Sequence, residues 1–370
     1  MKVETTKLKE AIRRLKNIVP HRMSLPILAC AKLEAVHGEL SLTANNLDME
    51  QTERIPCDGD IECLCVPLRS IEQALFNSPD TLIEMDGEKS IVITCGREET
   101  ILDFQLAEDF PKPMELAKPV KTGVSTAELA EAVENVKWCA STDTVRYILC
   151  GVHVAATDKK LRAEATDGKR LCVSDKNLIS AEFDVIIPNA VISGFSEALA
   201  RDGALLSVGA NGVLIEHNDG SFRAKLLEGN YPNTEQVMDK KPAKLGSCDL
   251  AELADVLARC SHFTDPARSE AVSLQFGPSG LELSSLGAGS AFNSYVAGKF
   301  IKHSSKMGAE LFLSTVKSMG TGQVEICKGD HAEDRKLILK TEALSVYIMG
   351  VSGDFQKRAR AGKQPELAGV

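Results

Sequence analysis

The strongest constraint on the fold is a pattern of helix and strand signals that occurs three times along the chain. In each copy, apolar residues at helical spacing precede short segments in which apolar residues alternate with other residues across a turn. Matching positions are separated by 121 residues for Leu28 and Leu149, and by 124 residues for Ser125 and Asp249. A repeat of this length predicts three domains of one fold.

The central copy carries the clearest signals. Ser125 and Glu128 have the spacing of a capping box, which predicts a helix start, and Asp249 and Glu252 repeat this spacing in the last copy. Residues 146–149 form a short apolar run that is read as a strand, and residues 152–156 and 161–165 are predicted to pair as a hairpin. One apolar stripe of the predicted helix consists of Leu129, Val133, Val136 and Ala140. The copy is therefore expected to place a helix on an antiparallel sheet.

Each copy continues with a second helix and a further pair of strands. The second helices of the first two copies are predicted to start after Pro67 and Pro188, because a helix start tolerates the missing N–H of proline. In the third copy, residues 311–313 are read as a strand and Ser314 as the start of a weaker helix. The predicted strand pairs are 91–93 with 101–106, 213–215 with 222–227, and 337–339 with 344–348. Helix starts are thus expected about every 60 residues, six in all.

The predicted fold class is α+β, with three similar domains that each contain a duplicated unit of helix and antiparallel sheet. The expected boundaries are residues 1–120 for the N-terminal domain, 121–244 for the central domain and 245–351 for the C-terminal domain. Residues 352–370 contain four basic and almost no apolar residues, which is typical of a disordered basic tail.

Composition limits the location and the partners of the chain. No run of 18 apolar residues occurs, so no membrane contact is expected, and the N-terminus lacks the apolar core of a secretory signal. The 11 cysteines show no framework spacing, which favours a reduced, cytoplasmic protein. A net charge of −9 argues against a generic nucleic-acid binder.

The charge is unevenly distributed, because residues 2–22 hold seven basic and two acidic residues. The basic residues are Lys2, Lys7, Lys9, Arg13, Arg14, Lys16 and Arg22. The corresponding helices of the other two copies are acidic instead. Charge alone does not decide between a solvated helix face and a binding surface.

Signals for catalysis are weak. Three fragments have the composition of serine acyl-enzyme motifs, at 314–317, 174–176 and 121–123, but their order is reversed and the middle one lacks its Asn. A serine acyltransferase is kept as an alternative. The cysteines at 57, 63 and 65 have no second ligand pair, so no metal is expected. No nucleotide-binding loop occurs, and no cofactor is expected.

Five short motifs carry a resemblance to a known family. They are LPIL at 25–28, VPLR at 66–69, DFP at 109–111, VRY at 145–147 and TDGKRL at 166–171. In this order and spacing, residues 1–351 resemble the bacterial sliding clamps, the β subunits of DNA polymerase III. The resemblance implies a non-catalytic processivity factor that forms a head-to-tail homodimeric ring around double-stranded DNA. Its implied partners are the polymerase III catalytic subunit, the clamp loader, and other polymerases and repair proteins, bound through short linear peptides.

The resemblance also assigns candidate residues. DNA contacts are implied for Arg22, Arg69 and Tyr147, and Lys9 and Arg13 of the basic first helix are added to them. The dimer interface is expected at Leu102, Phe104 and Phe263. A peptide pocket between the second and third domains is expected to be lined by Arg146, Leu149, Thr166, Gly168, Lys169, Arg170, Leu171, Pro232, Val237, Ile348 and Met349.

Three departures from the family pattern affect these expectations. Asp143 stands where the family has a DNA-contacting amide, and Asn189 where it often has a basic residue. Residues 350–353 lead into the basic tail instead of a short stub that would wall the pocket. A diverged clamp-like scaffold, which binds peptides without closing a ring, is therefore the main alternative.

Overall fold

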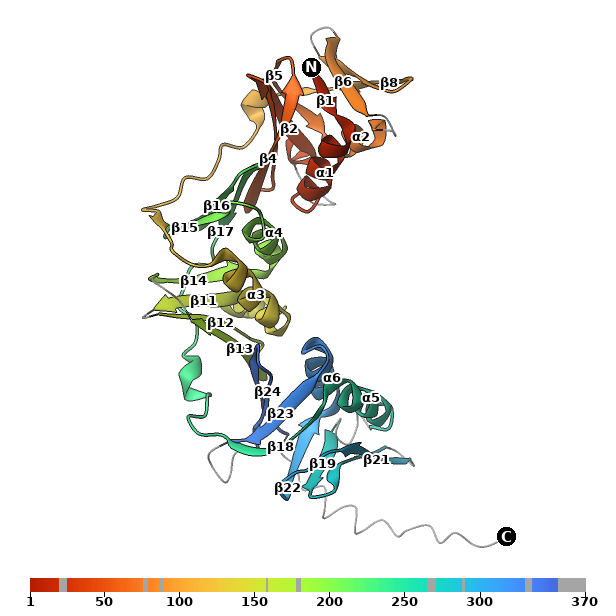
Figure 1. Cartoon of the computed structure of the whole chain (residues 1–370), viewed down its shortest axis with the longest axis vertical. Coiled ribbons are helices and arrows are strands. Elements are labelled where there is room, and N and C mark those ends of the chain that lie inside the picture. Colours follow the sequence, from red (N-terminus) through yellow and green to blue (C-terminus); the bar gives the residue numbers. More distant parts are fainter. Residues whose placement is uncertain are drawn as a thin grey trace, which may run out of the picture. The chain divides into compact units, whose positions relative to one another are not determined.

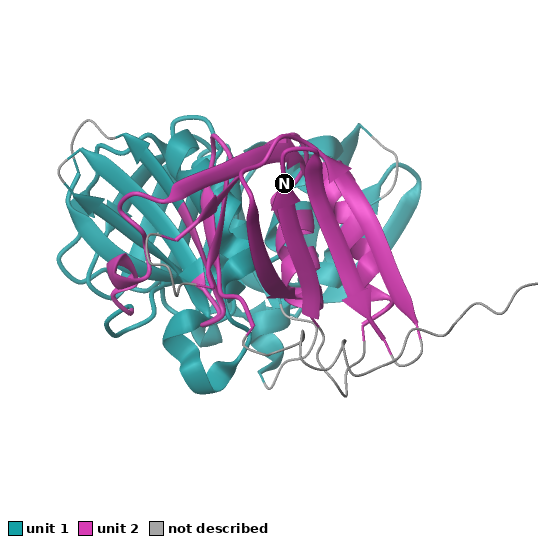
Figure 2. Cartoon of the chain, turned by 90° about the horizontal axis from the view of Figure 1, so that it is seen from below, with its two compact units in different colours: residues 1–165, 174–231 teal, residues 166–173, 232–370 magenta. Residues whose placement is uncertain are grey.

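The structure is a computed structural model that describes residues 1–19, 25–75, 79–86, 89–157, 159–177, 181–264, 271–287, 290–329 and 335–351. The chain forms two compact units (Figure 2). Unit 1 comprises residues 1–165 and 174–231, and unit 2 comprises residues 166–173 and those from Pro232 onward. The predicted tail, 352–370, lies outside the described residues.

Six α-helices occur in the described part of the chain, and they start about every 60 residues, as the repeat predicts (Figure 1). Unit 1 contains α1 (Thr5–Leu15), α2 (Leu68–Ala74), α3 (Thr126–Val136) and α4 (Asn189–Leu199). Unit 2 contains α5 (Leu250–Ser261) and α6 (Ala309–Ser318), which contact each other.

The strands of unit 1 form antiparallel sheets. Its strands are β1 (Lys2–Glu4), β2 (Cys30–Val36), β3 (Glu39–Asn45), β4 (Met49–Asp58), β5 (Ile61–Pro67), β6 (Asp80–Asp86), β7 (Ser90–Cys95), β8 (Glu98–Asp103), β9 (Gln105–Leu106), β10 (Val120–Lys121), β11 (Gly151–Thr157), β12 (Lys160–Thr166), β14 (Phe183–Pro188), β15 (Leu205–Val208), β16 (Gly212–His217) and β17 (Gly220–Lys225). One sheet runs in the order β10-β15-β16-β17-β4-β1-β6-β7-β8, and β3, β2, β5 and β9 extend it from β4. The strands β14, β11 and β12 are neighbours in a second sheet.

Unit 2 contains two further sets of antiparallel strands. Its strands are β18 (Ala243–Asp249), β19 (Ala271–Gly277), β20 (Gly280–Leu286), β21 (Ala291–Ala297), β22 (His303–Gly308), β23 (Gln323–Lys328), β24 (Leu337–Lys340) and β25 (Ser345–Ile348). The first residues of β13 (Arg170–Asn177) also belong to this unit and begin the order β13-β25-β24-β23-β18. The second sheet has the order β21-β20-β19-β22.

The predicted helix caps are present at two positions. The Ser125 hydroxyl accepts a hydrogen bond from the Glu128 amide at 3.4 Å, and α3 starts directly afterwards. The Asp249 carboxylate accepts from the amides of Ala251 and Glu252 at 2.9 and 3.0 Å and caps α5. Each cap provides a partner for an N–H group that the helix itself leaves unpaired.

The three predicted strand pairs are confirmed by the register of the sheets. Residue Ile91 faces Leu102 across β7 and β8, while Val213 faces Ala224 across β16 and β17. In unit 2, β24 pairs with β25. The first hairpin turns at His37 and Gly38, whose φ angles of 56° and 83° are both in the left-handed region that such two-residue turns require.

Two predicted strands are wrong. Residues 146–149 belong to a 3-10 helix, η4 (Thr144–Leu149), because the Asp143 side chain caps it by accepting from the Val145 amide at 3.1 Å. Residues 311–313 lie inside α6, which starts at Ala309 rather than at Ser314. In both places the apolar run was too short to show a period, so its composition alone favoured a strand.

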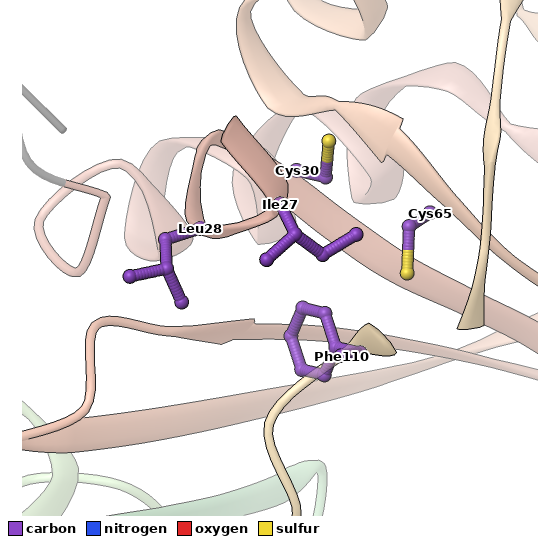
Figure 3. Packing of buried hydrophobic residues seen from close by; sticks show 5 residues of the cluster. All are labelled: Ile27, Leu28, Cys30, Cys65 and Phe110. Atoms are coloured by element: carbon purple, nitrogen blue, oxygen red, sulfur yellow. The ribbon is translucent and has the colours of Figure 1, made fainter. Parts of the chain in front are cut away.

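The core of the first repeat follows the apolar patterns of the sequence. Figure 3 shows one cluster of buried side chains in it, which consists of Ile27, Leu28, Cys30, Cys65 and Phe110. Burial raises the pKa of the Cys65 thiol to about 12, so this cysteine packs as an apolar residue. In the part of the chain that the structure describes, no group of His, Cys, Asp or Glu could hold a metal, and no helix is long and apolar enough to cross a membrane.

Candidate nucleic-acid and peptide interfaces

The basic surface of α1 is largely neutralised by carboxylates of unit 1. Lys2 pairs with Asp80 at 2.8 Å, and Lys16 pairs with Glu72 at 2.8 Å. Lys7 lies 3.3 Å from the Glu4 carboxylate. Arg14 is drawn into the unit and is held there by three glutamates, at positions 10, 53 and 197. Most of the positive charge counted in the sequence is therefore paired with carboxylates of the same unit.

Two of the predicted DNA-contacting cations remain available. Arg13 is exposed on α1, and Arg69 is exposed at the second position of α2. Neither has an ion-pair partner among the described residues. Lys9 is half-buried and has an interaction partner, and Arg22 lies outside the described residues. Exposed guanidinium groups of this kind suit weak, exchangeable contacts with phosphate.

Tyr147 is presented on the surface of unit 1 by η4. Its side chain is 54% exposed, and its hydroxyl donates to the Glu228 carbonyl at 3.2 Å. Gly229, next along the chain, has φ +137°, and a Cβ there would lie 2.5 Å from Cδ1 of Ile148. This φ angle favours glycine, and the segment after β17 lies against η4 at this point. Tyr147 is thus an oriented surface tyrosine in a 3-10 helix.

His153 of β11 makes a second contact with the segment after β17, through Tyr231. The Nδ1 atom of His153 lies 2.8 Å from Oε1 of Glu164, and its Nε2 atom lies 2.9 Å from Oδ1 of Asp184. Its ring stacks on that of Tyr231 with centroids 4.8 Å apart. Burial opposes protonation of His153, but the hydrogen bonds to the two carboxylates outweigh it and raise the pKa. This bridge was not predicted, because its residues come from three strands.

Two predicted pocket residues belong to unit 1. Arg146 is exposed, and its Nε atom lies 3.2 Å from Oδ2 of Asp143. Leu149 is buried, and its carbonyl accepts from the Ser141 amide at 2.8 Å. Asp143, which departs from the family pattern, therefore caps η4 and orients Arg146.

The turn at 166–171 in unit 2 is fixed by its own polar side chains. The Thr166 hydroxyl donates to the Arg170 carbonyl at 2.6 Å and accepts from the Gly168 amide at 3.0 Å. Gly168 has φ +88°, which requires glycine, and the exposed Lys169 amide donates to Asp167 at 2.8 Å. The turn delivers β13 to its antiparallel pairing with β25.

Arg170 anchors this turn to α6. Its Nε atom lies 3.1 Å from Oδ2 of Asp167, and its Nη1 atom donates to the hydroxyls of Ser314 and Thr315 at 3.1 and 2.8 Å. All three interactions are within unit 2. Arg170 is consequently held in place within unit 2, and its part in the peptide pocket stays a prediction.

Leu171 and Ile348 are core residues of the unit 2 sheet. Leu171 packs in a buried cluster with Val173, Cys327, Ile338 and Tyr347, and Met238 covers the cluster as a partly buried residue. Ile348 is fully buried opposite Arg170. The exposed apolar residues nearby in sequence are Val237, at 39%, and Met349, at 46%, while Pro232 is exposed as well. We call Val237, Met238 and Met349 the apolar surface of unit 2.

A buried ion pair holds part of this apolar surface in place. The Lys336 ammonium lies 2.8 Å from Oδ2 of Asp239, and the two side chains are 7% and 5% exposed. The same ammonium donates to the Val237 carbonyl at 2.7 Å. The pair fixes residues 237–239 against the start of β24. No local pattern in the sequence indicates this pair, since its partners are 97 residues apart, about a quarter of the chain.

The predicted dimer residues lie at two sheet edges. β8 is the last strand of its sheet, with Leu102 half-buried and Ile101 exposed. Phe104 lies just beyond this strand, and its amide donates to the Lys89 carbonyl at 3.0 Å. In unit 2, β21 is an edge strand, and Phe263 stacks on its residue Phe292 at 5.2 Å. Each edge leaves backbone groups of one strand without a ladder partner in its own sheet.

The fragments that resemble acyl-enzyme motifs are parts of regular elements. The Ser314 hydroxyl donates to the Leu311 carbonyl within α6 at 3.0 Å and accepts from Arg170. Ser174 is fully buried in β13, and Lys121 lies in β10. The hydroxyl of Ser314 is thus engaged by backbone and by a structural arginine.

Comparisons with known proteins point to one family. Residues 1–114 match the family model of the DNA polymerase III β subunit N-terminal domain, and residues 123–233 match that of its central domain. The β sliding clamp of Vibrio cholerae is 26% identical over 268 residues, covering 70% of this chain and 73% of the relative. The Caulobacter vibrioides β sliding clamp is 27% identical, covering 78% and 82%.

Solved structures show the same fold. The DNA polymerase III β subunit from Pseudomonas aeruginosa superposes with a TM-score of 0.82 at 20% identity, over 95% of this chain and 99% of that one. A DNA polymerase sliding clamp from Bacillus subtilis gives 0.83 at 20% identity with the same coverage. The α+β fold with three similar domains, predicted from the repeat, is confirmed by this likeness.

Proposed function

This chain belongs to the family of DNA polymerase III β subunits, the bacterial β sliding clamps, and on that premise we propose that it is a processivity factor. Two copies form a head-to-tail ring around duplex DNA in the cytoplasm. The ring tethers the polymerase and other replication and repair proteins to the template. It has no catalytic role, and its grip on DNA is topological. The match to two consecutive family domains, in order, is the observation that carries this proposal.

The charge distribution of unit 1 supports contact with DNA that permits sliding. Arg13, Arg69 and Tyr147 are exposed and are proposed to touch phosphates, as are Arg22 and Lys9. Most other cations of residues 2–16 are already paired with carboxylates. Because every neutralised phosphate adds to the affinity, a small number of available cations keeps the contact weak. The net charge of the whole chain, −9, disfavours binding of DNA to the outer surface.

The two sheet edges support ring closure by pairing of main chains. We propose that β8 of one copy adds to β21 of the other, with Leu102 and Phe104 on one side and Phe263 on the other. Edge strands of this kind need a partner or a cover, and antiparallel addition satisfies both edges at once. Stacking of Phe263 on Phe292 gives the second edge a rigid aromatic anchor.

The apolar surface of unit 2 supports binding of short linear peptides. Val237 and Met349 are exposed, and Lys336 restrains the segment that presents Val237. A preformed apolar surface lowers the ordering cost of binding a peptide, and methionine adapts to differently shaped side chains. Arg146 and Leu149 of unit 1, and the turn residues of 166–171, remain predicted contributors.

A primer-extension assay tests this function. The polymerase III catalytic subunit and clamp loader of the same cell copy a primed circular template with and without this chain. We expect product lengths to increase strongly when the chain is present. A scaffold without ring closure would bind the polymerase and leave product lengths unchanged. A serine acyltransferase would instead be labelled by a β-lactam probe, and the label would be lost in Ser314→Ala.

A further inference from the structure

A buried carboxylate lies inside unit 1 at the seam, where the N-terminal and central family domains meet. Glu53 of β4 has a side chain that is only 2% exposed. Its Oε1 atom accepts from Nε2 of Gln51 at 2.7 Å. Its Oε2 atom lies 3.1 Å from Nη1 of Arg14 and 3.5 Å from Nη2 of Arg201. One carboxylate is thus the ion-pair partner of two guanidinium groups.

The two arginines come from different parts of the chain. Arg14 belongs to α1, within the residues that match the N-terminal family domain, and Arg201 follows α4, within those that match the central domain. Glu53 itself faces Gly220 in the pairing of β4 with β17, which is the ladder that joins the sheets of the two domains. The carboxylate therefore links both domains from a position on their shared ladder.

The backbone at this seam is closely fitted. Gly220 has φ +154°, and a Cβ there would lie 2.0 Å from the Thr52 carbonyl oxygen. The Arg54 amide donates to the Asp219 carbonyl at 2.7 Å, and the Lys225 amide donates to the Asp48 carbonyl at 2.8 Å. Such a fit leaves little room for adjustment if the charges beside it become unbalanced.

The surrounding groups hold the two arginines within the fold. Arg14 also approaches Glu197 at 3.9 Å, and Arg201 lies 3.1 Å from Asp219. His217 is buried beside them, and burial together with the Arg201 charge lowers its pKa to about 4, so it adds no positive charge at neutral pH. The only carboxylate of this group that is almost completely buried is Glu53.

We propose that the ion pairs of Glu53 hold the N-terminal and central family domains together as one rigid body, and we call this arrangement the latch. Without the charge of Glu53, two guanidinium groups from different domains repel each other in a poorly solvated site, and the β4–β17 ladder opens more readily. If the chain forms a ring, as proposed above, the latch keeps this joint closed when the ring is opened for loading. The opening motion must then occur at another joint.

Native-state hydrogen exchange of the chain without DNA tests the latch. In Glu53→Gln we expect the amides of β4 and β17 to exchange roughly tenfold faster or more, because exchange of a ladder reports its local opening. Amides of β23 and β24 in unit 2 should exchange as in the wild type. Glu39→Gln is the matched control, since Glu39 is an exposed partner of Arg54 on the neighbouring strand β3.

A second variant keeps the test valid if Glu53→Gln does not fold. Arg201→Gln leaves the Glu53–Arg14 pair within the N-terminal domain and removes the Glu53–Arg201 contact, which crosses the seam. We expect it to speed exchange in β4 and β17 as well. Exchange at the seam within about twofold of the wild type in a folded variant would overturn the proposal. Because no DNA is used, this result is independent of whether the chain encircles DNA.

Discussion

Replacing Lys336 by methionine should destabilise unit 2 and weaken its apolar surface. The change keeps an unbranched side chain, one heavy atom shorter, but removes the ammonium that lies 2.8 Å from Asp239 and 2.7 Å from the Val237 carbonyl. Asp239 would then lose the ammonium that faces it in a buried site. Removing one partner of a buried ion pair costs about 3–5 kcal/mol.

This cost can be measured by amide exchange of β24 under native conditions. Exchange is preferable to a single unfolding midpoint, because a chain with two compact units need not unfold in one step. A cost of about 3–5 kcal/mol corresponds to exchange that is faster by roughly two to four orders of magnitude. Peptides that contact Val237 should also bind more weakly, because the segment that presents it loses its anchor.

Two further variants distinguish loss of the ion pair from nonspecific destabilisation of the fold. Lys240→Met removes an exposed lysine from the same segment and should change stability by less than about 0.5 kcal/mol. The double variant Lys336→Met with Asp239→Leu replaces the pair by apolar groups and should recover much of the loss. If Lys336→Met behaves like the Lys240 control, the reasoning about the buried pair is refuted.

Three other predictions concern pH, DNA and assembly. The hydrogen bonds of protonated His153 to Glu164 and Asp184 stabilise the fold fully below the unfolded pKa of about 6.5, and this stabilisation is lost as the pH rises through the raised folded pKa. The wild type should therefore lose more stability than His153→Gln as the pH rises above about 6.5. Equal losses would exclude the bridge. Arg69→Ala should lower the salt slope of DNA affinity by about 0.9, and an unchanged slope would remove this residue from the DNA contact. Phe263→Ala should weaken the dimer by about 2 kcal/mol, which a native mass measured over a range of concentrations would detect, and an unchanged dimer would place the interface elsewhere.

The fold could be predicted from the sequence because its signals are local and repeated. The caps at Ser125 and Asp249 and the alternating strands each depend on residues close in sequence, and three copies reinforce one another. The wrong predictions, at 146–149 and 311–313, were runs of three or four apolar residues. Such runs contain less than one helical turn of periodic information, so they cannot separate a helix from a strand.

The candidate site was less predictable, because its properties depend on partners far away in the chain. The sequence shows that Arg14 and Arg170 are basic, but only the fold shows that Glu53 holds the first and that Ser314 and Thr315 hold the second. Charge counted along a segment therefore overestimated the charge available to DNA. Which residues are buried was predicted better than which polar groups are free.

The apolar residues of the peptide site illustrate the same limit. Leu171, which belongs to a family motif, and Ile348 are both predicted pocket residues, yet both are buried in the unit 2 sheet. Exposure falls instead on Val237 and Met349, which follow turns and strand ends rather than strand interiors. A motif identifies the segment that builds a surface, but the register of its strand decides which side chains reach that surface.

Retention on DNA of different topology tests the central claim most directly. The chain is loaded on nicked circular DNA by its clamp loader, the loader is removed, and bound protein is followed before and after the circle is cut once. The account predicts stable retention on the circle and rapid loss after the cut, since a ring slides off a free end. Equal retention on circular and linear DNA would show that contact, rather than enclosure, holds this protein on its template.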